Sequence, residues 1–150
     1  DIKSLLKPFA THQFYIYCDV AAAQDDNNIH WRPFSRSGFL NDLKSCNGVI
    51  SNAGFELLSE ALYLGKKFLV KPLAGQMEQA SNAFVISELK LGTIMEKLNQ
   101  DVVERFLEAP SAPPVRYPDV ALIVAEWIES GNWEDVEGIV RLAWKDIKFR

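Results

Sequence analysis

The chain has 150 residues, of which 48% are hydrophobic and 24% are charged, and its formal net charge is −4. This composition is typical of one globular domain with enough bulk for a core, and it excludes a disordered tail. The acidic balance argues against a surface for the phosphate backbone, so we expect no nucleic-acid partner.

The cysteines and the hydropathy indicate the compartment. Cys18 and Cys46 are the two cysteines, and their spacing gives poor support to a disulfide framework or a thiolate zinc site, so we interpret them as thiols in a reducing environment. No apolar run approaches the ~20 residues of a membrane span, and no charged-then-apolar signal opens the chain. We therefore expect a cytoplasmic domain.

Helix-like and strand-like patterns alternate from the start of the chain. Residues 4–9 are typical of the end of a helix, and 21–28 are polar and predict a turn. Apolar, aromatic and β-branched residues indicate short strands at 13–18, 29–34, 47–51 and 66–73, with a weaker one at 93–98. Apolar spacing of three and four residues predicts helices at 39–46, 55–65, 76–92 and 99–109. Glycines close two of these helices, at Gly65 and Gly92.

This alternation predicts an α/β fold: a Rossmann-like, mostly parallel sheet with helices on both faces. The helix predicted at 99–109 has Asn99 or Gln100 near its cap. We divide the chain into a Rossmann-like domain at 1–109 and a helical extension at 110–150 packed on the same domain. The chain opens within a helix-like segment, whereas the first strand of a doubly wound sheet usually lies centrally, so we expect this domain to lack its first strand.

The extension begins with a proline-rich connector at 109–115. Two further helices are predicted at 117–131 and 132–147, separated by Gly131. They carry the tryptophans Trp127, Trp133 and Trp144. Packing in a core or in a docking surface explains these large side chains more simply than ligand binding does.

A glycine-containing turn, Ser51 to Gly54, joins a predicted strand to a predicted helix. The first N–H groups of a helix lack intrahelical partners and carry the positive end of its dipole, so an anion could bind there. The same turn is also an ordinary βα connection, and Glu56 in the first helical turn would repel a diphosphate. Glu60 lies further into the helix and either faces solvent or accepts hydrogen bonds from ribose hydroxyls.

A second polar cluster follows the strand at 66–73. Gln76, Glu78, Gln79 and Asn82 gather where the next helix begins, which is where ligands of open α/β sheets bind. Amides and carboxylates suit sugar hydroxyls, although a polar helix start with a capping role for Gln76 or its neighbours explains the cluster equally well. The two histidines, His12 and His30, pair with no acid at a ligand or triad spacing, so we predict neither a nucleophile nor a metal centre.

The order of these motifs resembles the carboxyl-terminal half of GT-B glycosyltransferases. The motifs are W-x-P at 31–33, VISNAG at 49–54, Glu60 six residues after the glycine, G-K-x-x-L-V-x-P at 65–72 and Q-x-E-Q-x-x-N-A at 76–83. Similar segments occur in UDP-glucuronosyltransferases and in the bacterial N-acetylglucosaminyltransferase that completes lipid II.

The resemblance implies that this half binds a nucleotide-sugar donor, with a UDP-sugar as the first expectation and no metal or other cofactor required. The implied contacts are Glu60 to the ribose; Ser51, Asn52, Ala53, Gly54 and Phe55 to the diphosphate; Gln76, Glu78 and Gln79 to the sugar; and Arg32, Pro33 and Phe34 against the base. The chain departs from the glucuronosyltransferases, which have histidine and a second glycine at Asn52 and Ala53. It departs from the lipid II enzyme, which has glutamine at Glu78.

The intact enzyme implied by the resemblance would transfer the sugar to an acceptor that the sequence does not identify. No catalytic residue is assigned, because the acceptor-binding domain that usually supplies the base does not fit in 150 residues. We expect that domain to be a missing amino-terminal part or a partner chain, and the chain alone to be inactive. A peripheral membrane acceptor and a homodimer stay open. So do two alternatives: half of a nucleotide-sugar 2-epimerase, and a non-catalytic assembly module whose interface is the aromatic helices.

Overall fold

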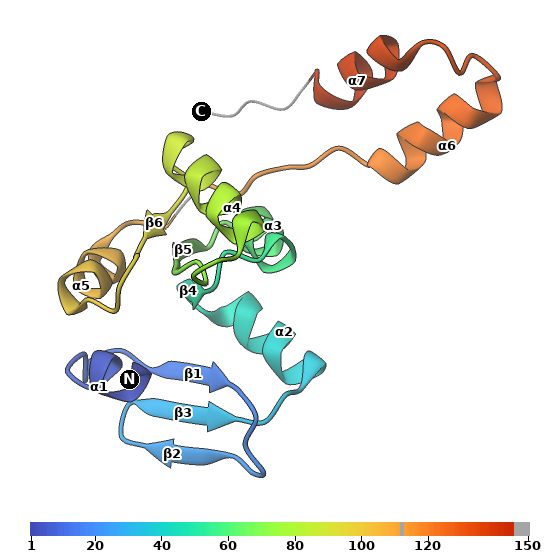
Figure 1. Ribbon diagram of the computed structural model, residues 1–150. Coiled ribbons are helices and arrows are strands. Elements are labelled where there is room, and N and C mark those ends of the chain that lie inside the picture. Colours follow the sequence, from blue (N-terminus) through green and yellow to red (C-terminus); the bar gives the residue numbers. More distant parts are fainter. Residues whose placement is uncertain (112, 146–150) are drawn as a thin grey trace. The chain divides into compact units, whose positions relative to one another are not determined.

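The computed structural model describes residues 1–111 and 113–145, and it has an α/β fold (Figure 1). The chain divides into two compact units, Asp1–Pro114 and Val115–Arg150. The strands of the first unit are β1 (Phe14–Tyr17), β2 (Gln24–Asp26), β3 (Ile29–Arg32), β4 (Gly48–Ser51), β5 (Lys67–Val70) and β6 (Thr93–Ile94). Its helices are α1 (Ile2–Leu6), α2 (Arg36–Ser45), α3 (Phe55–Tyr63), α4 (Met77–Glu88) and α5 (Gln100–Glu108).

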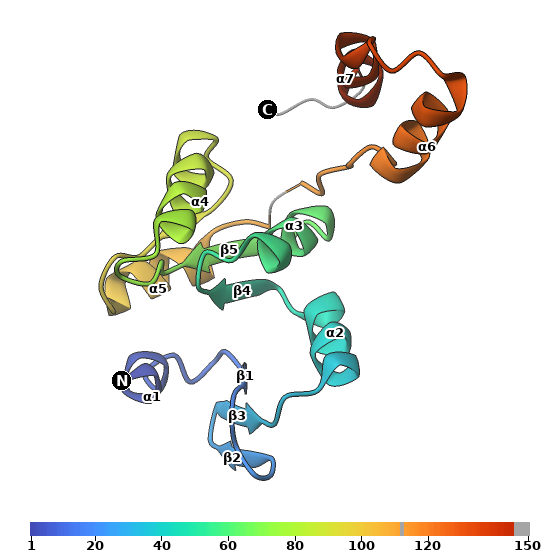
Figure 2. The same cartoon turned by 45° about the vertical axis from the view of Figure 1, so that its right-hand side comes forward.

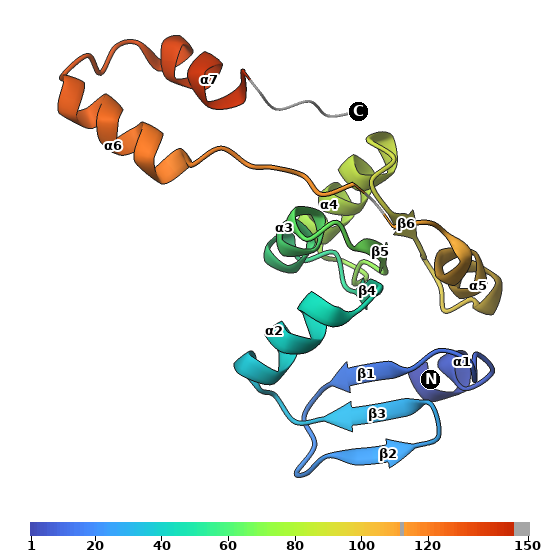
Figure 3. The same ribbon diagram turned by 180° about the vertical axis from the view of Figure 1, so that it is seen from behind.

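The strands form two three-stranded sheets, whereas we predicted one. The first has the order β1-β3-β2, with β1 parallel and β2 antiparallel to β3; the second is parallel throughout, in the order β4-β5-β6 (Figures 1 and 3). The predicted turn at 21–28 was wrong in part, because it contains β2. Its polar residues form a strand because Asn27, at φ 55°, and Asn28 turn the chain back, so that Asp25 lies opposite His30.

One apolar layer contacts strands of both sheets. It consists of Leu5, Leu6, Ile29, Leu69, Met95, Val103 and Phe106, all buried. Helices α1 and α5 supply four of these side chains, and the Nε2 of Gln100 at the start of α5 donates to the carbonyl of Ser4 in α1 (3.2 Å). The two helices lie side by side in all three ribbon views (Figures 1 to 3). They therefore cover the same face of the two sheets.

The opposite faces are covered by other helices. Side chains of α3 and α4 pack with those of β5 around Phe68 and Val70, and Figure 2 shows β4 beside β5. On β1, Tyr17 points to the face away from Phe14 and Ile16, and its hydroxyl donates to Asp42 of α2 (2.8 Å). Helices thus lie on both faces, as predicted.

Two neighbouring lysines bind the carboxyl ends of helices on opposite faces. Lys66 Nζ donates to the carbonyls of Lys44 and Cys46, which end α2. Lys67 Nζ donates to the carbonyls of Leu107 and Ala109, both at 2.6 Å, which end α5. Because successive residues of an extended chain point to opposite sides, one dipeptide fixes a helix on each face, and each cation meets the negative end of a dipole.

The predicted glycine that ends α3 is confirmed, and the one that ends α4 is wrong. Gly65 has φ 66° directly after the C-cap Leu64. After α4 the left-handed residue is Lys90, at φ 54°. Gly92 has another reason to be glycine: a Cβ there would overlap the ring of Phe68, so the backbone approaches the core too closely for any side chain.

The second unit contains α6 (Val120–Ser130) and α7 (Val136–Trp144), joined through Gly131 at φ 71°. Asp119 and Asp135 cap their amino ends. No described residue of this unit is buried, and Trp133 is 64% exposed. The predicted last helix reached residue 147, and its final two positions lie outside the described residues. Among the described residues, no helix combines the length and apolar character that a membrane crossing requires.

Candidate functional site

Two loops leave the second sheet at the same edge. In the parallel pair of β4 and β5, Ser51 lies opposite Val70, and the N–H of Lys71 donates to the carbonyl of Ser51 (2.9 Å). The loop of residues 52–54 and the loop of residues 71–76 both begin at these carboxyl ends. The two polar clusters of the sequence therefore lie at one sheet edge, where open α/β sheets bind ligands.

The helices that follow these loops begin without a side-chain cap. Gly54 is the N-cap of α3 and Gln76 the N-cap of α4, and neither makes a side-chain cap hydrogen bond. The other five helices are capped by the side chains of Asp1, Ser35, Asn99, Asp119 and Asp135. Gln76 thus occupies the N-cap position that the capping alternative gave it or its neighbours, but its side chain makes no cap hydrogen bond. Among the described helices, α3 and α4 are the two whose first N–H groups have no acceptor from an N-cap side chain.

Two side chains of α4 hold the loops in place. Asn82 Nδ2 donates to the carbonyl of Ala53, which is fully buried (2.9 Å). The Oε1 of Gln79 accepts from the N–H of Leu73 (2.9 Å). The amide oxygen of Gln79 is thus bound to the loop after β5. The hydrogen bond from Asn82 fixes the turn after β4 relative to α4. The two residues lie one helical turn apart on α4, but their partners belong to other segments of the chain, so no signal in the sequence pointed to this support.

Gly54 is not required by the fold. Its φ is −72° and ψ is 137°, which any residue adopts, and a Cβ built there meets no atom within 4 Å. The space in front of this helix terminus is therefore open, in contrast to Gly92, where the ring of Phe68 fills it.

The acidic residues of the site are exposed. Glu56 and Glu60 lie four residues apart on α3, hence on one side of the helix, and Glu78 is in the first turn of α4. Gln76 is exposed, and so is Phe55, at 67%. Glu60 thus belongs to the helix that begins at the open turn, on its solvent side.

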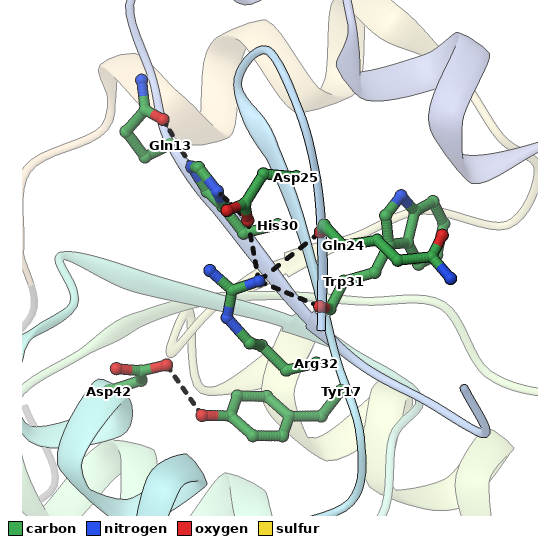
Figure 4. A network of polar contacts seen from close by, with 8 residues as sticks. All are labelled: Gln13, Tyr17, Gln24, Asp25, His30, Trp31, Arg32 and Asp42. Atoms are coloured by element: carbon green, nitrogen blue, oxygen red, sulfur yellow. Dashed lines mark hydrogen bonds and ion pairs between the residues drawn. The ribbon is translucent and has the colours of Figure 1, made fainter. Parts of the chain in front are cut away.

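Arg32, Pro33 and Phe34 belong to the first sheet and its outgoing loop. Arg32 Nη1 donates to the carboxylate of Asp25 (2.7 Å) and to the carbonyl of Trp31 (2.9 Å), and these bonds hold the guanidinium against β2 and β3 (Figure 4). Pro33 is half-buried, and Phe34 is 75% exposed. No described contact joins these three residues to the edge at β4 and β5.

The prediction that His30 pairs with no acid was wrong. Its Nδ1 lies 2.8 Å from Asp25 Oδ1 and its Nε2 lies 2.7 Å from Gln13 Oε1 (Figure 4). The ring also stacks on Tyr15. The pairing arises across β2 and β3, which the sequence did not reveal. The hydrogen bond from His30, followed by that from Arg32, lowers the pKa of Asp25 below its ordinary 3.8.

No metal centre is supported in the part of the chain that the structure describes, where no three His, Cys, Asp or Glu side chains gather around a common point. Cys18 and Cys46 are free and half-buried, and burial raises the pKa of the Cys46 thiol.

A parallel sheet whose strands are followed by helices that begin at its carboxyl edge defines an α/β protein. The family described as "Glycosyl transferase family 1" matches residues 1–110. The chain belongs to that family. This confirms the glycosyltransferase resemblance drawn from the motifs.

The crystal structure of the glycosyltransferase SnogD from Streptomyces nogalater is similar to this chain, with a TM-score of 0.54 and 23% sequence identity. The match covers 69% of this chain and 30% of SnogD, so the chain spans about a third of that enzyme. At this identity the likeness concerns the fold. No curated protein matches the sequence.

Proposed function

We propose that residues 1–109 are the donor-binding half of a GT-B glycosyltransferase, and that they hold the nucleotide-sugar at the carboxyl edge of β4 and β5. The observation that carries the proposal is the pair of helices, α3 and α4, that begin at this edge without side-chain caps. A diphosphate supplies the acceptor oxygens that these N–H groups lack. Membership of the family supports the class of ligand.

The chemistry of this edge suits a leaving diphosphate. When the bond between the sugar and the diphosphate breaks, negative charge develops on the diphosphate, and fixed N–H groups at a helix start stabilise it without reorganising. The carbonyl of Ala53, bound by Asn82, fixes the turn that presents them. Glu56 and Glu78 add negative charge at the same two helix starts and therefore repel a diphosphate. Cationic groups elsewhere in the intact enzyme must offset this repulsion, or the two carboxylates must point away from the diphosphate.

The remaining contacts follow the same assignment. Glu60 accepts hydrogen bonds from the ribose hydroxyls, and Gln76, Glu78 and the free NH₂ of Gln79 contact the sugar. For the base, Phe34 offers an exposed ring, whereas the guanidinium of Arg32 is held by Asp25. We therefore assign stacking on the base to Phe34 rather than to Arg32.

The test is a calorimetric titration of the chain with UDP, dTDP and GDP. We expect one of the three to bind, and Glu60→Ala to weaken binding by about ten-fold or more, as for the loss of a charged hydrogen bond of ~1.5–3 kcal/mol. Glu56→Ala is the matched control, since it removes the same charge one turn earlier on the same side of α3. We expect it to leave affinity unchanged or to raise it.

A second variant separates binding from folding. Gly54→Val places a branched side chain where a Cβ meets no protein atom, so we expect its unfolding midpoint to stay within a few degrees of wild type. The same side chain would stand in front of the α3 terminus and abolish nucleotide binding. Absence of binding by the wild-type chain to all three nucleotides would contradict the proposal.

An assembly role is the second candidate, and the exposed apolar side chains of α6, of α7 and of the segment between them favour it. The largest are Val120, Leu122, Ile128, Trp133, Val136, Val140, Leu142 and Trp144. Sedimentation equilibrium discriminates between the two: self-association that Trp133→Ser abolishes, without any nucleotide binding, would support assembly.

A further inference from the structure

We infer that Asn82 is a positioning residue for the diphosphate of the donor. Through its hydrogen bond to the carbonyl of Ala53, it directs the N–H of Gly54 into the open space in front of α3. The inference rests on the proposed function, because that function and the family supply the ligand. It goes further by assigning a role at the turn to an amide that the sequence pattern had grouped with contacts to sugar hydroxyls.

The carbonyl of Ala53 depends on Asn82 for its hydrogen bond. Ala53 is fully buried, and no backbone N–H of the described residues donates to its carbonyl. The Nδ2 of Asn82, on α4, donates to it at 2.9 Å. Because a buried carbonyl without a donor is unfavourable, this bond fixes the direction of the carbonyl toward α4.

The geometry of one peptide group links this carbonyl to Gly54. The C=O of Ala53 and the N–H of Gly54 belong to the same peptide group, and the peptide groups of the described chain are trans. In a planar trans peptide the C=O and the N–H point in opposite directions, so the N–H of Gly54 points away from α4. Among the described residues it has no acceptor, and a Cβ built on Gly54 would meet no atom within 4 Å. Gly54 thus presents a fixed donor to an open space.

The preceding carbonyl of the turn is also held by a side chain. Ser51 Oγ donates to the carbonyl of Asn52 (2.8 Å). Two successive carbonyls of the turn, those of Asn52 and Ala53, therefore accept from side chains. Rotation of the Ala53–Gly54 peptide by half a turn would point a carbonyl oxygen at the ligand, and that oxygen would repel a diphosphate. The bond from Asn82 opposes this rotation.

Asparagine is an unfavourable residue for the helix that carries it. Its short amide competes for backbone groups, so alanine, glutamine or glutamate would stabilise the interior of α4 better. The neighbouring side chains of Ala83 and Ile86 pack in the core, whereas the amide of Asn82 reaches the turn after β4. The contact with the turn is therefore the physical reason for an asparagine at this position.

The direction of the Gly54 N–H matters most when negative charge develops on the leaving diphosphate. A donor that already points at the ligand stabilises this charge without reorganising, whereas a peptide group that rotates must first be ordered. In the proposed assignment, the nucleoside part of the donor does not contact this turn. Loss of the Asn82 bond should therefore weaken binding of a diphosphate and leave binding of a nucleoside nearly unchanged.

The test compares a nucleoside diphosphate with its nucleoside by NMR titration of the full chain: UDP with uridine, or the same pair for dTDP or GDP if one of those binds. Asn82→Leu keeps a side chain of similar size and removes the donor. The matched control is Ser81→Ala, at an exposed position beside it on α4. In Asn82→Leu we expect diphosphate affinity to fall by about ten-fold or more and nucleoside affinity to stay within about two-fold of wild type. Ser81→Ala should change neither.

The amide of Gly54 gives a second measurement, which a merely structural role of Asn82 would not affect. When the diphosphate binds to the wild-type chain, the proton resonance of this amide should move downfield, because the N–H gains an acceptor. In Asn82→Leu at saturating diphosphate the movement should be smaller. The wild-type measurement tests the direction of the N–H even if Asn82→Leu does not fold.

The other results overturn the inference. A diphosphate that binds without moving the Gly54 resonance does not use this donor. Equal losses of diphosphate and nucleoside affinity in Asn82→Leu, or no loss of either, mean that Asn82 supports the fold alone. These three results leave the proposed function standing, since the wild-type chain still binds a nucleotide. If the wild-type chain binds no nucleotide, the proposed function and this inference are both wrong.

Discussion

Asn28 is the buried polar side chain of the first unit, 3% exposed, and it connects β3 to the end of α1. Its Nδ2 donates to the carbonyls of Phe9 (3.0 Å) and Leu6 (3.3 Å). Each carbonyl also accepts a backbone N–H, Leu6 from Phe9 and Phe9 from His12, so loss of the Asn28 donor costs the net worth of two hydrogen bonds. Asn28→Leu should therefore lower the free energy of unfolding by about 1–3 kcal/mol.

Urea unfolding measures this effect, and Asn27→Gly is the control. Asn27 is the exposed neighbour with φ 55°, a conformation that glycine adopts without strain, so we expect a change of less than about 1 kcal/mol. Equal stability losses in the two variants would show that the Asn28 contacts do not hold α1.

The hydroxyl of Tyr17 makes the stability of the fold depend on pH. Burial, reinforced by the hydrogen bond to Asp42, raises the pKa of its hydroxyl from 10.0 to about 12. Because the folded state keeps the proton longer than the unfolded state, the stability that Tyr17 contributes is full below pH 10 and is lost as the pH rises toward 12. Phenolate absorbance should show a step at high pH that Tyr17→Phe removes.

Asp42→Asn separates the two causes. It removes the charge and leaves most of the burial, so the titration of Tyr17 should move down toward its ordinary pKa without reaching it. A titration that does not move would mean that Asp42 has no influence on Tyr17.

At the scale of elements, Lys67 stabilises the end of α5. Its ammonium donates to two carbonyls at that end and lies 5.4 Å from the centre of the Phe106 ring, and desolvation lowers its pKa. Lys67→Met keeps the length of the side chain and removes the donor. We expect a loss of about 1.5–3 kcal/mol in the free energy of unfolding, as for hydrogen bonds to charged groups.

The matched control is Lys97→Met, an exposed lysine for which we expect a change within about 0.5 kcal/mol. Hydrogen exchange locates the effect: amides of α5 should exchange faster in Lys67→Met, while those of α3 keep their rates. Uniform acceleration over both helices would contradict a local role.

At the scale of the whole molecule, the sequence predicted the strands that have a strong apolar pattern. It missed β2, which is a strand only because it pairs with β3. β1, β3, β4 and β5 are short runs of aromatic and β-branched residues, and each was predicted within two or three residues. β2 is Gln24-Asp25-Asp26, which has no strand propensity, and it is a strand because β3 pairs with it. The division into two sheets follows from long-range pairing, which no local pattern encodes.

The candidate site shows the same division. Both polar loops were predicted at strand ends, because a strand, a turn and a helix are visible in local sequence. The absence of a side-chain cap bond at Gln76, and the bond from Asn82 to Ala53, depend on distances in the folded chain and could not be predicted. The same holds for Arg32, whose ion pair with Asp25 arises from the unpredicted hairpin.

The division of the chain at Pro114 gives the last prediction. Every buried residue of the described chain lies at or before Phe106, and α6 and α7 contribute none. Removal of residues 115–150 therefore takes away no buried core side chain, and apolar burial is the main source of stability. We expect residues 1–114 to unfold cooperatively, with a thermal midpoint within a few degrees of the full chain. A midpoint lower by ten degrees or more, restored by adding 115–150 as a separate peptide, would show instead that the helical extension packs on the domain, as the sequence predicted.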